Sequence, residues 1–281
     1  KIIDEGEKYN LPAIKLNYRG EPLLHPQLEE MIKYAKDNGV IEVMFNSNGL
    51  ALNDTRIRKL IDAGLNRIIF SFDGATKETY EKIRVGSNYD VVVRNIRRFV
   101  EIRDEIGLKI PSIRVQMCAQ PNNIPELKMF VDMWKDTVNR IGFGILKDPN
   151  EVMHAERFPC PQIWQRLIIC YDGEVRLCCG DWNGDLSAPI GMLDQYNSIR
   201  DIWINNSYIK KIREMHLAGK SSEIDVCSRC DINTKITNEK IDELMEIYNK
   251  RDTSPAVVAK IKHIEKMMAR AILHKVNSTD L

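Results

Sequence analysis

The sequence predicts an α/β fold with parallel strands, followed by a small cysteine-rich domain and a helical tail. Over the first 150 residues, short apolar runs alternate with amphipathic segments of helical period. Such runs are typical of strands covered on both faces, and intervening helices imply parallel pairing. From about Asp148 the composition changes, because prolines follow at 149, 159 and 161 and six of the seven cysteines lie between residues 160 and 230. We therefore predict domains at 1–150, 151–232 and 233–281.

The individual elements follow from the spacing of apolar residues. Five strands are expected, at residues 13–16, 41–45, 67–72, 113–117 and 141–146. Helices are expected at about 26–39, 54–64 and 90–106, and later at 198–206 and 208–217. A hairpin is expected at 167–178, where Asp172-Gly173 supplies the turn. Segment 233–281 has apolar residues at helical spacing, which predicts packing on the body of the protein or on a partner chain.

Small polar residues and glycines follow the predicted strands. They read Arg19-Gly20-Glu21, Asn46-Ser47-Asn48-Gly49, Ser71-Phe72-Asp73-Gly74 and Lys147-Asp148. Each stretch by itself is equally well explained as a turn, because turns use these residue types. Parallel α/β folds, however, bind ligands at the carboxyl ends of their strands. The joint placement therefore indicates a site for a polar ligand.

Charge and hydropathy exclude several classes of function. Forty-one basic residues against forty acidic ones leave a formal net charge of +1, so no electrostatic footprint for nucleic acid or an anionic membrane is present. No apolar run approaches the roughly 20 residues that span a bilayer. The odd number of cysteines in a large chain favours metal or redox chemistry in the cytoplasm over a disulfide framework.

Four cysteines have the spacing of a metal site. Cys227 and Cys230 are separated by two residues, which is common in zinc and iron–sulfur sites. Cys160 and Cys178 form a second pair, brought together by the predicted hairpin. Cys179 neighbours Cys178, and adjacent strand residues point to opposite sides, so one of the two is a ligand and spacing favours Cys178.

The two other cysteines are expected to be structural. Cys118 ends an apolar strand and Cys170 lies within one, which predicts that both are core residues.

The combined order of these motifs resembles the radical S-adenosylmethionine (radical SAM) superfamily. The polar loops after the first three visible strands resemble its core, and Cys-x12-Gly-x4-Cys followed by Cys-x2-Cys resembles its SPASM/twitch extension. The resemblance implies a partial (β/α)6 barrel that binds SAM at its rim. It also implies an auxiliary [4Fe–4S] cluster held by Cys160, Cys178, Cys227 and Cys230.

The resemblance also implies residues for the SAM site. Gly20-Glu21-Pro22 would bind the methionine amino group, and Ser71 and Asp73 would lie near the ribose or carboxylate. Further candidates for the same pocket are Asn46, Arg84 and Gln116. Arg84 is a suitable cation for the SAM carboxylate, although a solvated arginine at a helix end explains it equally well. Asp181, just after the Cys178-Cys179 pair, is a candidate proton acceptor or simply a turn residue.

This sequence departs from the family pattern in two ways. The Cys-x3-Cys-x2-Cys motif that binds the catalytic [4Fe–4S] cluster is absent, and Lys1 is not an initiator. We therefore expect a first strand and this motif upstream of residue 1. No cysteine follows Cys230, which favours one auxiliary cluster over two.

The activity expected from the resemblance is radical hydrogen abstraction. The 5′-deoxyadenosyl radical would act on a small molecule or a peptide, in a dehydrogenase-like reaction, with flavodoxin or ferredoxin as electron donor. Two alternatives are a binding module stabilised by zinc at four cysteines and a catalytically inactive homologue.

Overall fold

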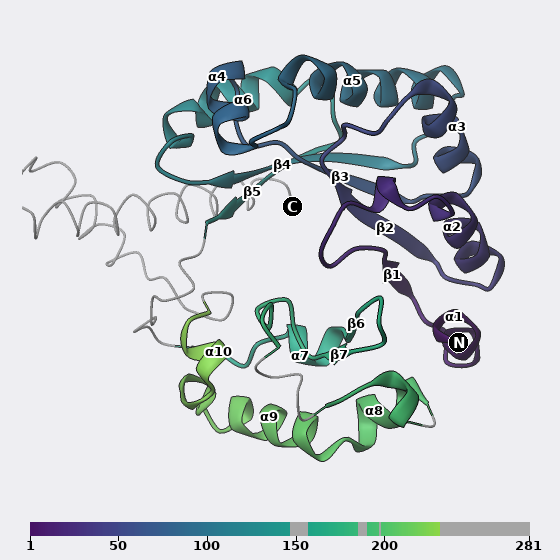
Figure 1. Ribbon diagram of the computed structural model, residues 1–281, viewed down its shortest axis with the longest axis vertical. Helices are drawn as coiled ribbons and strands as arrows, with labels where there is room; N and C mark the ends of the chain where they lie inside the picture. Colours follow the sequence, from purple (N-terminus) through teal and green to yellow (C-terminus); the bar gives the residue numbers. More distant parts are fainter. Residues whose placement is uncertain (147–156, 185–189, 197, 231–281) are drawn as a thin grey trace, which may run out of the picture. The chain divides into compact units, whose positions relative to one another are not determined.

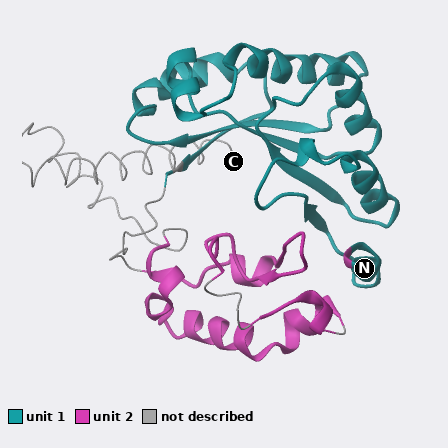
Figure 2. Cartoon of the chain, viewed as in Figure 1, with its two compact units in different colours: residues 1, 3–146, 239–281 teal, residues 2, 147–238 magenta. Residues whose placement is uncertain are grey.

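The computed structural model describes residues 1–146, 157–184, 190–196 and 198–230 (Figure 1). These residues form two compact units, the first built on Ile3–Leu146 and the second on the described residues from Arg157 to Cys230 (Figure 2). The predicted domain boundaries near 150 and 232, the Lys147-Asp148 loop and the predicted C-terminal helices lie outside the described residues. None of the helices in the described part combines the length and apolar character needed to cross a membrane.

The first unit is built on a five-stranded parallel sheet with strands in chain order. The strands are β1 (Ala13–Lys15), β2 (Glu42–Ser47), β3 (Arg67–Ser71), β4 (Ser112–Ala119) and β5 (Arg140–Ile145). All five predicted strands are confirmed, with ends shifted by one or two residues. Because each strand pairs with the next one along the chain, the sheet has the open, sequential order of a partial (β/α) barrel.

Helices cover one face of this sheet (Figure 1). They are η1 (Pro22–Leu24), α2 (Leu28–Asp37), α3 (Asp54–Asp62), α4 (Lys77–Ile83), α5 (Tyr89–Glu105), η2 (Ile124–Glu126) and α6 (Leu127–Trp134). Three begin at a side chain that accepts a backbone N–H of the first turn: Asn53 caps α3, Thr76 caps α4 and Asn88 caps α5. Helix α1 (Ile2–Lys8) precedes β1, has no buried residue and lies apart from this layer (Figure 1).

The hydrophobic core lies between the sheet and these helices. Alternate residues of β4 are buried, including Val115 and Met117, whereas Gln116 and Cys118 between them are only partly buried. A cluster of aromatic rings closes the core beside the end of β3, where Phe72 stacks on Tyr80 with ring centroids 4.5 Å apart. The opposite face of the sheet therefore carries the polar side chains of the strands.

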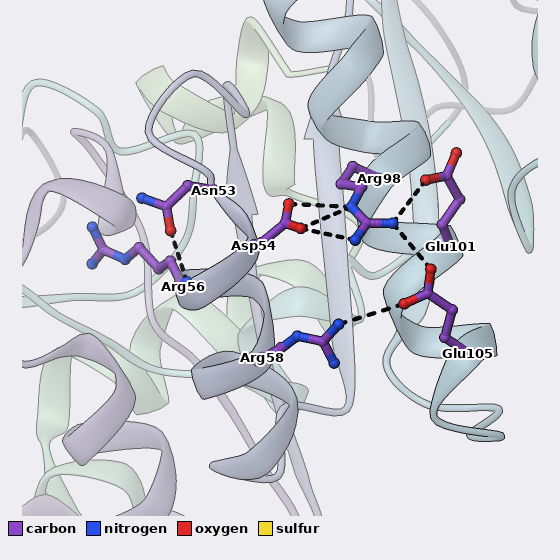
Figure 3. Close-up of polar contacts among 7 residues, drawn as sticks. All are labelled: Asn53, Asp54, Arg56, Arg58, Arg98, Glu101 and Glu105. Carbon is purple, nitrogen blue, oxygen red and sulfur yellow. Dashed lines mark hydrogen bonds and ion pairs between the residues drawn. The ribbon is translucent and has the colours of Figure 1, made fainter.

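Helices α3 and α5 are also linked by charges on the surface (Figure 3). Arg98 of α5 binds Asp54 at 2.8 Å and Glu105 at 3.1 Å, and Arg58 of α3 approaches Glu105 at 3.4 Å. All of these side chains are solvent-exposed to a considerable degree, so water and salt screen the pairs and each contributes little to stability. The packing of the two helices depends on their apolar faces instead.

The second unit is small and joins a hairpin to short helices. Its elements are α7 (Gln162–Gln165), β6 (Ile168–Ile169), β7 (Val175–Arg176), η3 (Leu193–Gln195), α8 (Ile199–Asn205), α9 (Ser207–Leu217), η4 (Ser221–Glu223) and α10 (Asp225–Ser228). Strands β6 and β7 are antiparallel, which confirms the predicted hairpin, and α8 and α9 confirm the two predicted helices. A separate core includes Val175, Leu177, Ile202 and Ile209.

Candidate functional site

The Glu21 carboxylate joins the loops that follow β1 and β2. Its Oε1 accepts hydrogen bonds from Ser47 Oγ (2.8 Å) and the backbone N–H of Leu23 (3.1 Å), and its Oε2 accepts one from Asn48 N (2.7 Å). Before it, Gly20 has φ +77° and is exposed; after it, Pro22 is buried at the start of η1. Glu21 therefore fixes the positions of the loops at the carboxyl ends of β1 and β2. A contact of Gly20, Glu21 or Pro22 with SAM stays a prediction.

The loop after β3 is held by an ion pair between a buried aspartate and a partly buried arginine. Asp73 is 5% exposed; its Oδ1 accepts the backbone N–H of Cys118 at 2.6 Å, and its Oδ2 lies 2.7 Å from Arg84 Nη2. Gly74 is required next to it, because an added Cβ would lie 2.5 Å from Tyr80 N. The structure thus brings Asp73 and Arg84 together, and Asp73 positions the guanidinium.

A residue that the sequence analysis missed, Glu126, stabilises the same loop. Its carboxylate accepts the backbone N–H groups of Ala75 (2.6 Å) and Thr76 (3.1 Å) and the hydroxyl groups of Thr76 (2.7 Å) and Thr79 (2.5 Å). Burial alone would raise the pKa of Glu126, but the hydrogen bonds from Thr79, Thr76 and the two backbone groups outweigh it and lower the pKa.

Replacing Glu126 with alanine is expected to lower the free energy of unfolding by about 2 kcal/mol, because charged hydrogen bonds to the loop are lost. The lowered pKa gives this contribution a pH dependence. It is fully present above the reference pKa of 4.5 and is lost as the pH falls through the lower folded-state pKa. Urea unfolding of wild type and variant at neutral pH and near pH 3 checks this. An equal difference at both pH values would contradict the charged role of Glu126.

Three other predicted residues lie at the same edge of the sheet. Ser71 and Gln116 are paired neighbours on β3 and β4, and both are partly buried. Asn46 on β2 donates its backbone N–H to Asn17 Oδ1 at 2.8 Å. In the part of the chain that the structure describes, Asn46 Oδ1 and Arg84 Nε are buried without a hydrogen-bond partner. Buried polar atoms are normally paired with a hydrogen-bond partner. The Asn46 oxygen can accept a hydrogen bond and the Arg84 guanidinium can donate one to an anionic group. Both fit a polar ligand that carries a carboxylate, and SAM is such a ligand.

In the second unit, the four predicted ligands Cys160, Cys178, Cys227 and Cys230 line one cavity, and Cys179 lines it as well. Cys227 and Cys230 lie on either side of the end of α10, where Cys230 N donates to Cys227 O at 3.0 Å. Cys160 and Cys227 are each 8% exposed, and the other two are partly buried. The structure therefore brings together the four cysteines that the spacing predicted.

The four thiols affect one another electrostatically. Burial, together with the nearby Cys178, Cys230 and Cys160 thiols, raises the pKa of Cys227 to about 12 against the opposing effect of Arg157. Burial likewise raises the pKa of Cys178 to about 12. Thiolates at such close quarters need a compensating cation, and metal binding supplies one while releasing the protons.

Four cysteine thiolates form a ligand set that suits both an iron–sulfur cluster and a structural zinc ion. Among the described residues, a separate trio of metal-type ligand atoms lies within 4.8 Å of one another, and it consists of Cys170, Asp172 and Glu174 on the hairpin.

Two further residues beside this cavity were missed from the sequence. Arg157 donates from Nη1 to Cys230 O and from Nη2 to Ser228 O, both at 2.8 Å, and so holds the turn that carries Cys227 and Cys230. His216, on α9, is 1% exposed and contacts both Cys160 and Cys227. The sequence could have indicated that His216 is buried, because it follows Ile209 by seven residues and therefore lies on the same, buried face of α9.

The expectation of core positions for Cys118 and Cys170 was wrong. Both are partly buried, and Cys118 lies on the face of β4 opposite the core residues Val115 and Met117. Burial raises the pKa of Cys118 to about 11, with Asp73 adding to the effect. Cys179 is exposed, in contrast to its neighbour Cys178.

Asp181 is fully buried next to the cysteine cavity. Its backbone N–H donates to Cys178 O at 3.2 Å, and its backbone carbonyl accepts from Arg176 Nη1 at 2.7 Å. The turn role weighed from the sequence is thus present, and a role as proton acceptor stays a prediction.

Both units match known domain families. The model of the radical SAM superfamily matches residues 18–111, and SPASM, an iron–sulfur cluster-binding domain, matches residues 160–231. The chain contains a radical SAM domain followed by a SPASM domain. These domains imply SAM and [4Fe–4S] clusters as cofactors, and the SPASM match begins at Cys160 and ends just after Cys230. The upstream Cys-x3-Cys-x2-Cys motif stays a prediction.

Relatives of the radical SAM domain differ in their reactions. The chain is 35% identical over 132 residues to a probable GTP 3′,8-cyclase of Methanococcus maripaludis. The aligned residues are 47% of this chain and 42% of that protein. It is 30% identical over 141 residues to a tungsten-containing aldehyde ferredoxin oxidoreductase cofactor-modifying protein of Pyrococcus furiosus. This alignment covers 47% of this chain and 38% of that protein. The chain thus spans less than half the length of these relatives.

Solved structures show the same fold at low identity. BtrN in complex with AdoMet and 2-DOIA aligns with a TM-score of 0.50 at 16% identity, covering 82% of this chain and 76% of that one. Streptococcus suis SuiB bound to precursor peptide SuiA aligns with a TM-score of 0.58 at 10% identity, covering 91% and 67%. These likenesses support the α/β fold predicted from the sequence.

Proposed function

We propose that this chain is part of a radical SAM enzyme with one auxiliary [4Fe–4S] cluster. The observation that carries the proposal is the convergence of four cysteines on one cavity, downstream of a parallel sheet with a polar carboxyl edge. Bound to a reducing cluster on the upstream Cys-x3-Cys-x2-Cys motif, SAM supplies a 5′-deoxyadenosyl radical that abstracts a hydrogen atom from the substrate.

The residues of the sheet edge bind and orient SAM. Asn46 Oδ1 accepts a hydrogen bond from the ligand, and Arg84, held by Asp73, attracts its carboxylate. Glu21 keeps the loops after β1 and β2 in place, while Ser71 and Gln116 line the same edge.

The auxiliary cluster is held by Cys160, Cys178, Cys227 and Cys230. The cluster would accept an electron from the substrate or help to position the substrate, and Asp181 is proposed as a nearby proton acceptor. The substrate is a small molecule or a peptide, because a relative acts on a nucleotide by its name and a structural neighbour binds a precursor peptide. A flavodoxin or ferredoxin supplies electrons, and a dehydrogenase-like oxidation is the specific reaction that we propose.

Anaerobic reconstitution of the 281-residue chain tests the cluster. We expect brown protein with broad visible absorption and about four irons per chain. Colourless protein with one zinc ion would instead indicate the zinc-stabilised binding module. The coding sequence upstream of residue 1 tests the enzymatic part. We expect three clustered cysteines there and, in the longer protein, reductive cleavage of SAM to 5′-deoxyadenosine; a complete upstream segment without these cysteines would indicate an inactive homologue.

A further inference from the structure

His216 bridges two of the four cavity cysteines. Its Nδ1 lies 3.3 Å from the backbone nitrogen of Cys160, and its Nε2 lies 3.4 Å from Cys227 Sγ. The ring is fixed from the side by Trp164, which packs edge-on with centroids 6.3 Å apart. With 1% of the residue exposed, no water competes for either nitrogen.

These contacts determine the tautomer of the imidazole. The Cys160 backbone nitrogen can only donate, so Nδ1 accepts its hydrogen bond and carries no proton. A histidine ring without a proton on Nδ1 carries its proton on Nε2. The Nε2–H group therefore points at Cys227 Sγ.

We infer that His216 donates a hydrogen bond from Nε2 to the Cys227 thiolate and thereby raises the reduction potential of the auxiliary cluster. The inference rests on the proposed cluster site. It adds a residue that is not an iron ligand and acts on the cluster through a hydrogen bond to one of its cysteine ligands. Hydrogen bonds to cluster sulfurs are among the factors that set reduction potentials. A donor stabilises the reduced cluster more than the oxidised one, because the reduced form has more negative charge on its sulfurs.

Two substitutions separate the two hydrogen bonds of the ring. In His216→Asn, the amide oxygen can take the place of Nδ1 and accept from Cys160, but nothing reaches Cys227. In His216→Gln, the amide nitrogen can take the place of Nε2 and donate to Cys227, while the contact with Cys160 is lost. Both variants therefore carry a neutral amide side chain. His216→Asn retains the contact with Cys160, and His216→Gln retains the contact with Cys227.

The midpoint potential of the reconstituted chain, followed by EPR during redox titration, is the measurement. We expect His216→Asn to lower the equilibrium constant for one-electron reduction about tenfold, a shift of about −59 mV. His216→Gln is expected to stay within about threefold of the wild-type constant, a shift of less than about 30 mV. Equal shifts in both variants, or none in His216→Asn, would overturn the inference.

A measurement on the unmodified protein covers the case in which a variant does not retain its cluster. Wild-type chain with ring-¹⁵N histidine, reduced and examined by pulsed EPR, is expected to show hyperfine coupling between the cluster and an imidazole nitrogen. Absence of this coupling in protein that holds about four irons would overturn the inference while leaving the proposed function intact. Wild-type protein without a cluster would instead contradict the proposed function.

Discussion

Replacing Cys178 with serine is expected to remove the auxiliary cluster, whereas replacing Cys179 with serine is expected to leave it in place. The side chain of Cys178 is partly buried at the cavity, and burial together with the neighbouring thiols raises its pKa to about 12. Cys179 is exposed. Serine preserves the size of the residue but not the thiolate ligand. Iron content is therefore expected to fall from about four to below one per chain in Cys178→Ser and to remain near four in Cys179→Ser.

Cys118→Ser is a suitable second control, because Cys118 lies in the first unit on β4. Iron analysis and visible absorption after anaerobic reconstitution distinguish the three variants. The reverse pattern, with loss in Cys179→Ser and retention in Cys178→Ser, would assign the ligand to Cys179. Retention in both would mean that neither cysteine is a required ligand.

Most of the sheet could be predicted because strand patterns are local. The runs that became β2 and β3 each contain three consecutive apolar residues, 43–45 and 68–70, and end in polar turns, so their existence and order followed from the chain alone. The convergence of Cys160, Cys178, Cys227 and Cys230 on one cavity was also predictable, since the predicted hairpin has a turn signal at Asp172-Gly173.

Residues whose role depends on distant partners could not be found in this way. Glu126 contacts a loop about fifty residues earlier in the chain, and His216 lies 56 residues from Cys160. Neither contact leaves a periodic pattern in the sequence. Cys118 is different, because a signal was present: strict alternation in β4 puts it on the face opposite Met117, and the core assignment relied on residue type instead.

The Asp73–Arg84 pair is expected to contribute strongly to the stability of the first unit. Replacing Asp73 with alanine leaves the Cys118 backbone N–H and the Arg84 guanidinium without their acceptor, in a place where Asp73 is 5% exposed. We expect the free energy of unfolding to fall by about 2–3 kcal/mol, because a hydrogen bond to a charged group is lost and the Cys118 N–H is left unsatisfied, whereas Arg84, whose side chain is 28% exposed, can still reach water. Urea unfolding with an unchanged denaturant slope measures the loss. A loss below about 0.5 kcal/mol would contradict the buried role of this carboxylate.

A double-mutant cycle separates the ion pair from the backbone contact. Asp73→Asn can retain the hydrogen bond to Cys118 N–H, and Arg84→Met removes the charge while keeping an apolar stem. The two are expected to couple by about 0.5–3 kcal/mol, because the charged atoms lie 2.7 Å apart. If Arg84 also binds the SAM carboxylate, Asp73→Asn should weaken SAM binding as well, since the guanidinium loses the partner that orients it. Additive effects on stability would show that Arg84 is held by other contacts and that Asp73 does not position it.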